Sequence, residues 1–160
     1  MSETFDSFSW FDGSEMSPLT QTTWADYWRG IVPDGIVAGI GNEMNTFSNS
    51  TGLYVYVDTG ECMIDNHRGV VQTMKTLPIV TPDTEYDRID VVVARVVYGN
   101  ENESTMVLDI LTGTADLDPV KPEITQNTGG VYEIPLAVIK VGANVPTITA
   151  DDVTDARFIQ

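Results

Sequence analysis

The chain has 160 residues, of which 42% are apolar and 20% charged, a composition that excludes a wholly disordered protein and is typical of one globular domain. Its 24 acidic and 8 basic residues give a net charge of −16, and the bases are scattered, so neither nucleic acid nor an anionic membrane is an expected partner. Apolar runs such as Val91–Ala94 are too short to span a bilayer, and the N-terminus lacks the features of a signal peptide, which favours synthesis in a cytoplasm.

Residues 1–22 are interpreted as an acidic N-terminal arm that precedes a single β-domain over residues 23–160. Ser2–Pro18 carries four acids and no base, yet it also holds four aromatic side chains, which solvated linkers usually lack. A segment this short cannot bury its own rings, so we expect it to dock, either back onto its own domain or onto another protein. The candidate partner-binding residues are Phe5, Phe8, Trp10 and Phe11.

The arm is followed by a predicted short helix, Thr23–Gly30. A threonine can cap its start and Gly30 can end it. Trp24, Tyr27 and Trp28 share one face at helical spacing, and the expected role of that face is packing against the core.

From Gly30 onward the pattern predicts short β-strands, in order 36–40, 53–57, 62–66, 75–79, 88–98, 105–112 and 131–141. We expect 53–57 and 62–66 to form a hairpin across the turn Asp58–Glu61, with another turn at His67–Gly69. Pro78 predicts an edge position for 75–79, because proline cannot donate to a sheet ladder.

Arg88–Tyr98 is apolar on much of both faces and is expected to be the central strand. Arg88 and Asp90 share a face and are interpreted as a structural ion pair, whereas Arg95 lies in an apolar run and needs a partner. The expected core consists of Ile36, Val55, Val57, Ile64, Ile89, Val91, Val93, Val107, Leu136 and Val138.

Short strands separated by glycine, asparagine and aspartate turns predict an all-β fold, either a β-sandwich or a partly closed antiparallel barrel, with one short N-terminal helix. Helices and strands do not alternate along the chain, which excludes a nucleotide-binding α/β fold.

No catalytic residue, metal site or cofactor is predicted. Gly39 and Gly41 lack the third glycine of a dinucleotide-binding loop. The single Cys62 and single His67 form a conceivable nucleophile pair, but a buried cysteine beside a turn histidine is the more ordinary interpretation. Acidic clusters at 58–65, 83–90 and 151–155 are suited to Ca²⁺ by residue type and are more simply a solvated rim.

Several segments occur in an order that resembles the β-structured module of tailed-bacteriophage minor tail, tail-fibre and baseplate proteins. They include Leu53–Val57, Gly60–Ile64, Arg88–Val93, Leu111–Ala115, Tyr132–Val138 and Asp155–Arg157. The resemblance covers Trp24–Arg157 and implies a structural module without catalytic residues. It assigns motif positions with a structural role to Arg88, Asp90, Asp155 and Arg157.

The expected function is therefore that of a non-enzymatic virion structural protein, a small tail, baseplate or fibre-base component. It is expected to dock on other virion proteins through its N-terminal arm and to form a homo-oligomer, with a trimer as the first guess. One alternative is a head decoration or head-fibre protein. Another is a module that binds a host surface glycan, with candidate aromatics Tyr54, Tyr56, Tyr86, Tyr98 and Tyr132.

Overall fold

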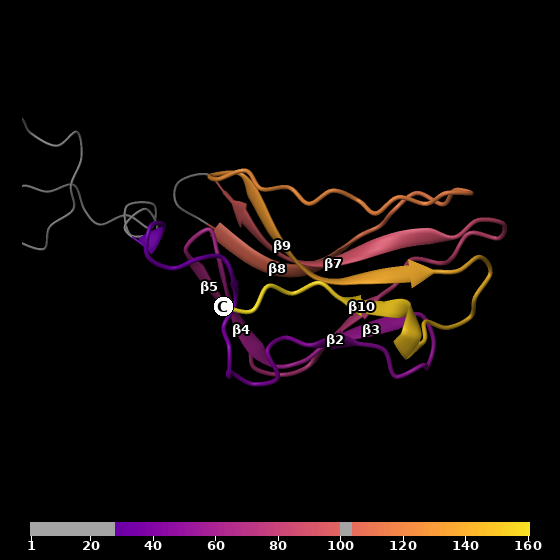
Figure 1. The fold of residues 1–160 in the computed structure, drawn as a ribbon, viewed down its shortest axis with the longest axis horizontal. Coiled ribbons are helices and arrows are strands. Elements are labelled where there is room, and N and C mark those ends of the chain that lie inside the picture. The colour runs from indigo at the N-terminus through magenta and orange to yellow at the C-terminus, as the bar shows by residue number, and fades with distance from the viewer. Residues whose placement is uncertain (1–27, 100–103) are drawn as a thin grey trace, which may run out of the picture.

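The structure is a computed structural model that describes residues 28–99 and 104–160. In these residues the chain forms three β-sheets, in which the named strands pair antiparallel, and no sheet closes into a barrel (Figure 1). This confirms the all-β prediction. The N-terminal arm and the predicted helix as far as Tyr27 lie outside the described residues.

The described strands follow one another along the chain, with a short 3-10 turn, η2, near the C-terminus. Their bounds are β1 Gly35–Ile36, β2 Thr46–Phe47, β3 Tyr54–Val57, β4 Gly60–Ile64, β5 His67–Val71, β6 Lys75–Pro78, β7 Arg88–Tyr98, β8 Ser104–Leu111, β9 Val131–Val141, η2 Ala150–Asp152 and β10 Val153–Asp155. The sheets have the orders β1-β4-β5, β2-β3-β6 and β10-β9-β7-β8. The predictions of β7 as a central strand and β6 as an edge strand are thus confirmed.

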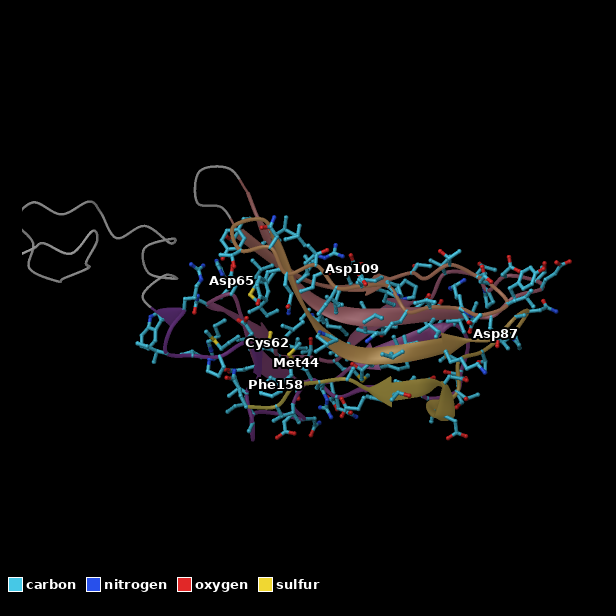
Figure 2. All side chains as sticks on the ribbon, turned by 45° about the horizontal axis from the view of Figure 1, so that its top comes forward. Met44, Cys62, Asp65, Asp87, Asp109 and Phe158 are labelled. Atoms are coloured by element: carbon cyan, nitrogen blue, oxygen red, sulfur yellow. The ribbon has the colours of Figure 1, made fainter. Side chains whose placement is uncertain are left out.

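The four-stranded sheet lies over the two smaller sheets, and the main core fills the space between them (Figure 1). Met44 and Cys62 lie in this interior, whereas Asp65 and Asp87 lie toward opposite ends of the molecule (Figure 2). The larger sheet contributes alternate residues of β7, and the smaller sheets contribute the inward residues of β3 and β4. Fully buried members include Ile36, Val55, Val57, Ile64, Val92, Val96, Leu136, Ile139 and Ile148.

Strand β7 is buried on both faces. Val92, Ala94 and Val96 belong to the main core, and Val91 and Val93 are buried on the opposite, outer face. Residues 112–130, which we call the strap, run along that outer side (Figure 1). Backbone hydrogen bonds fix the strap near both ends, from Asp116 N to Asp87 O (3.1 Å) and from Glu133 N to Thr125 O (2.8 Å).

A β-bulge in β9 changes which of its residues face the core. Val92 pairs with Ala137 and Val93 with Pro135, so Leu136 is the extra residue. The inward set therefore shifts from even to odd numbers, and Ala137, Ile139 and Val141 are buried while Val138 is only half-buried. The prediction that Leu136 and Val138 share the core face is wrong for this reason.

Two other expected core residues also lie elsewhere. Val107 is 40% exposed, because β8 is an edge strand and this residue does not point toward the main core. Ile89 is half-buried on the outer face, where the strap passes close to its backbone. A Cβ on Gly113 would lie 2.1 Å from the Ile89 carbonyl oxygen, so the close approach requires glycine.

The predicted hairpin between 53–57 and 62–66 is also wrong. Strand β3 pairs with β2 and β6, whereas β4 pairs with β1 and β5, so the chain changes sheets between β3 and β4. The tight turn is Asp65–Asn66, with φ of 43° and 65°, and His67–Gly69 belongs to β5. Aspartate and asparagine tolerate this left-handed conformation, which two-residue hairpin turns require.

The main core should respond strongly to a charge at Val92, which is fully buried. We expect Val92→Asp to lower the free energy of unfolding by roughly 3–5 kcal/mol, since it places an unpaired carboxylate in the interior. Val97→Asp, on the same strand at a site that is 37% exposed, is the matched control. Urea unfolding measures both, and equal effects would contradict the assigned faces of β7.

Candidate functional site

A cavity of about 390 Å³ lies where the three sheets present their free edges. Strands β5, β6 and β8 each end the strand order of their sheet, and all three contribute lining residues. Met44 and Cys62 contribute from the core side, and Val70 and Val107 from β5 and β8. We call this cavity the edge groove.

The edge groove is apolar and free of acid. Of the described residues that line it, none is acidic and Lys75 alone is basic. Val70 and Val107 are 45% and 40% exposed, and the neighbouring Met74 is 51% exposed. Single exposed apolar residues are ordinary, but apolar residues gathered around a cavity indicate a binding surface.

Lys75 is a positive charge at this groove that has no ion-pair partner in the described part of the chain. Six of the eight bases form ion pairs: Arg29, Arg68, Arg88, Arg95, Lys140 and Arg157. Lys75 forms no ion pair within residues 28–99 and 104–160. In a chain of net charge −16, an acid-free site with a free lysine favours an acidic, apolar partner segment.

The edge of β8 is open to backbone pairing. Natural edge strands are usually protected by lysine, proline, a bulge or very short length. Ser104–Leu111 has eight residues, contains no lysine or proline, and pairs with β7 without a break in register. Its outer edge therefore offers hydrogen-bonding groups beside an apolar cavity, an arrangement that accepts an added strand.

Cys62, which lines the core side of the edge groove, lacks the properties of a catalytic nucleophile. Burial is the main cause that raises the pKa of the Cys62 thiol to about 11, and the Glu61 charge raises it further, against a backbone hydrogen bond from Gly69. A thiol of this kind stays protonated at neutral pH, whereas catalytic cysteines have lowered pKa values. Strand register places Gly69 opposite Cys62 and His67 opposite Ile64, so the cysteine and histidine do not face each other across the hairpin.

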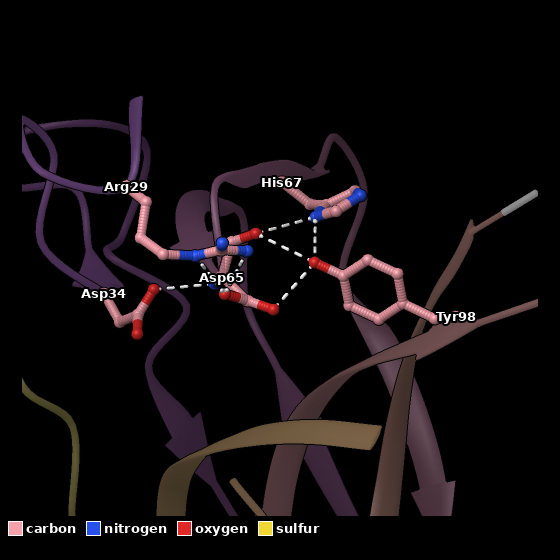
Figure 3. A network of polar contacts seen from close by, with 5 residues as sticks. All are labelled: Arg29, Asp34, Asp65, His67 and Tyr98. Atoms are coloured by element: carbon pink, nitrogen blue, oxygen red, sulfur yellow. Dashed lines mark hydrogen bonds and ion pairs between the residues drawn. The ribbon is translucent and has the colours of Figure 1, made fainter. Parts of the chain in front are cut away.

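His67 belongs to a separate polar cluster at the β4–β5 turn (Figure 3). Asp65 is its centre: its carboxylate accepts hydrogen bonds from Arg29 Nε (3.2 Å) and Tyr98 Oη (2.7 Å), and its carbonyl oxygen accepts one from His67 Nδ1 (2.9 Å). Asp34 in turn accepts the backbone N–H of Asp65 at 2.6 Å. These contacts hold the start of the described chain against the turn.

Two atoms of the turn, Asn66 Oδ1 and His67 Nε2, are buried without a hydrogen-bond partner in the described structure. Burial, together with the hydrogen bond to Asp65 and its charge, raises the pKa of Tyr98, while Arg29 opposes the shift. Tyr98 therefore stays neutral and acts as a donor. The cluster positions the start of the described chain against the β4–β5 turn.

The four motif positions form two ion pairs, as the sequence predicted for Arg88 and Asp90. Arg88 Nε lies 3.0 Å from Asp90 Oδ1, with both side chains at most 5% exposed. The guanidinium also donates to the Val80 and Thr81 carbonyl oxygens, and Asp90 accepts the N–H of Gly113 at 2.9 Å. This pair ties the start of β7 to the loop before it and to the strap.

Asp155 and Arg157 form the second pair, at 2.7 Å, with the aspartate 55% exposed. The hydrogen bond from Arg157 is the main cause that lowers the pKa of Asp155, and the same bond raises the pKa of Arg157. Arg157 also donates to the Glu43 carbonyl oxygen at 2.7 Å, which fastens the C-terminal segment to the loop before β2.

Arg95, for which the sequence analysis required a partner, forms ion pairs with two carboxylates. Its guanidinium lies 2.7 Å from Glu133 Oε1 and 2.8 Å from Asp109 Oδ2. Glu133 is 2% exposed and also accepts the N–H of Thr125 in the strap, at 2.6 Å. The Arg95 guanidinium therefore links β7 to β8 and β9, and Glu133 extends this link to the strap.

The acidic clusters serve mainly as local hydrogen-bond acceptors. Asp83 accepts the N–H groups of Glu85 and Tyr86, and these bonds lower its pKa; Asp87 accepts the N–H of Ala143, and Asp152 that of Thr149. Within the described residues no group of three or more potential ligands is arranged to hold a metal ion. No described helix has the length and apolarity to cross a membrane.

The remaining candidates are distributed over the molecule. Phe5, Phe8, Trp10 and Phe11 lie outside the described residues. Of the five tyrosines considered for glycan binding, Tyr54 and Tyr86 are exposed, at 45% and 39%. Tyr56 stacks on Phe47, and Tyr98 and Tyr132 are half-buried. Sequence reasoning missed the edge groove, although the edge position predicted for β6 was a partial signal.

Comparison of the chain with protein-family models, with curated proteins and with solved structures found no match.

The two motif ion pairs should differ in their contribution to stability. Asp90→Asn leaves the Arg88 charge buried and uncompensated, and we expect it to lower the free energy of unfolding by roughly 3–5 kcal/mol. Asp155→Asn breaks a pair whose aspartate is exposed, and the expected loss is below about 1 kcal/mol. Urea denaturation of both variants tests the difference, and similar losses would contradict it.

Cys62 should react slowly in the folded protein. We expect iodoacetamide at pH 8 to alkylate it much more slowly than the same cysteine in urea, because the thiol is buried and its pKa is raised to about 11. Mass spectrometry over time measures both rates. A native rate equal to the unfolded rate would show an accessible thiolate and restore the nucleophile hypothesis.

Proposed function

We propose that the chain is a non-enzymatic structural protein of a larger assembly and that the edge groove is its docking surface. The observation that carries the proposal is the convergence of three free strand edges on an apolar, acid-free cavity in a strongly acidic chain. Burial of apolar surface drives association, and the free edges supply the backbone hydrogen bonds that give an added segment its register.

Charge explains why this surface is the favoured one. Copies with a net charge of −16 repel one another over most of their surface, so contact is least opposed where acids are absent. The groove meets this condition, and Lys75 adds a local attraction for an acidic partner. The exposed Val70 and Val107 provide the apolar rim.

The finer fold proposed is an open β-sandwich, with the four-stranded sheet as one layer and the two smaller sheets as the other. The shared core between these layers supports it. In such a fold the side formed by the outer edges of β5, β6 and β8 stays open, and the edge groove lies on this side.

The proposed setting is the virion of a tailed bacteriophage, in which the chain is a small tail, baseplate or fibre-base component. The ordered motif series supports this setting, and so do the structural contacts of Arg88, Asp90, Asp155 and Arg157. The alternative setting is that of a head decoration or head-fibre protein, which would also dock through the edge groove. A glycan-binding module is the second candidate, favoured by the exposed rings of Tyr54 and Tyr86.

A charge at the rim of the groove should abolish docking without unfolding the domain. We expect Val107→Glu to convert assembled protein to monomer, because it places a carboxylate on an apolar, partly exposed site. Val120→Glu is the matched control, since Val120 is 75% exposed on the strap and does not line the groove. Light scattering measures mass, and circular dichroism checks the fold.

Assembly that is unchanged in Val107→Glu would contradict the docking surface. The setting is tested separately, by immunolabelling of purified phage particles that encode the chain. Absence from intact particles excludes the virion proposal, and binding on a glycan array by protein that is absent from particles favours the second candidate.

A further inference from the structure

We propose that the occupant of the edge groove is the segment Asp6–Asp12 of a second copy of the chain, added as a strand beside β8. This inference rests on the proposed docking function of the groove and names its partner. The described chain begins at residue 28, so 27 residues lie beyond the described domain, including the acidic aromatic arm.

The alternation of the arm matches the groove. In an extended strand, Asp6, Phe8, Trp10 and Asp12 fall on one face, so two aromatic rings are flanked by a carboxylate at each end. The groove has a corresponding arrangement, an apolar interior and a free lysine, Lys75. Phe8 and Trp10 therefore fill the cavity, and one of the two aspartates pairs with Lys75.

The other face of the same strand also finds an apolar neighbour. Phe5 and Phe11 lie on that face, with Ser7 and Ser9 between them. On β8, Met106, Leu108 and Ile110 pack toward the core, and Val107 lies on the alternate, outer face with 40% exposure. A strand added to the edge of β8 thus brings a phenylalanine toward Val107 while Phe8 and Trp10 face inward.

The exit of the chain favours a neighbouring copy as the donor. Residues 28–32 lie at one extreme of the long axis, beyond β5 (Figure 1). The hydrogen bond from Arg29 to Asp65 and the bonds of Ile31 N and Val32 N to the Trp28 carbonyl oxygen hold the chain there. In the proposed contact, the segment that precedes Trp28 reaches the groove of an adjacent subunit, and because each copy has one arm and one groove, the contact can repeat from copy to copy.

The test uses two full-length variants that each lack one half of the contact. Phe8→Ser/Trp10→Ser removes the two inward rings and keeps the groove, whereas Val107→Glu blocks the groove and keeps the arm. Ser14→Asn/Ser17→Asn is the control for the arm, because both positions lie outside the proposed docking segment Asp6–Asp12. Circular dichroism establishes that each variant retains its β-structure.

We expect each of the two variants to be monomeric alone, with self-association weakened about tenfold or more. When they are mixed, the intact arm of one binds the intact groove of the other, and light scattering should detect a one-to-one heterodimer. The serine control should assemble as the unaltered chain does. Charge reversal gives a second readout: Lys75→Glu should weaken assembly, and Asp6→Lys or Asp12→Lys should restore it.

The outcomes separate this inference from the proposed function. If Val107→Glu dissociates the protein but the Phe8/Trp10 variant still assembles, the groove docks another segment and the inference on the arm is wrong. If the unaltered chain is monomeric with its own arm in its own groove, or if the mixed variants stay apart, the second copy is excluded. If Val107→Glu assembles normally, the docking function itself fails.

Discussion

The burial of β7 on both faces is the constraint on which the rest of the structure depends. A strand that carries valines on alternate sides must be covered twice, and here the smaller sheets cover one face and the strap the other. The charges that β7 carries into these interfaces are neutralised where they occur. Arg88 is neutralised by Asp90, and Arg95 by Glu133 and Asp109.

The two sides of the fold are sealed unequally. On one side, the C-terminal segment fills the outer edge of β1, because Ile36 exchanges backbone hydrogen bonds with Phe158 and Gln160. Arg157 fastens the same segment to Glu43. On the other side, no strand within the described residues pairs with the outer edges of β5, β6 and β8. The edge groove is the result of this asymmetry.

The sequence predicted the elements whose signals are local. The bounds of β7 and β9 follow from long β-branched runs, and the edge position of β6 follows from Pro78. Features that depend on which strands pair, and in which register, could not be predicted from local sequence signals. The bulge at Leu136 reverses the facing of later residues of β9, and the change of sheet between β3 and β4 separates two strands that a short turn had suggested as a hairpin.

The candidate site was harder to predict than the fold, because it is made by three edges that are distant in sequence. Met44, Val70 and Val107 come together in the groove although no spacing along the chain relates them. The ion pair of Arg88 and Asp90 could be predicted, since residues two apart on a strand share a face. Arg95 called for a partner, but its contacts with Glu133 and Asp109 required the sheet register.

The contact between β1 and the C-terminal segment sets the order in which a newly made chain can fold. Ile36 forms a parallel bridge with Ile159, so the outer edge of β1 waits for residues that are synthesised more than a hundred positions later. On the ribosome, the β1-β4-β5 sheet therefore remains open on that side until synthesis has passed Gln160. Pairings of such long range make folding slow, and a stalled chain would expose both edges of this sheet at once.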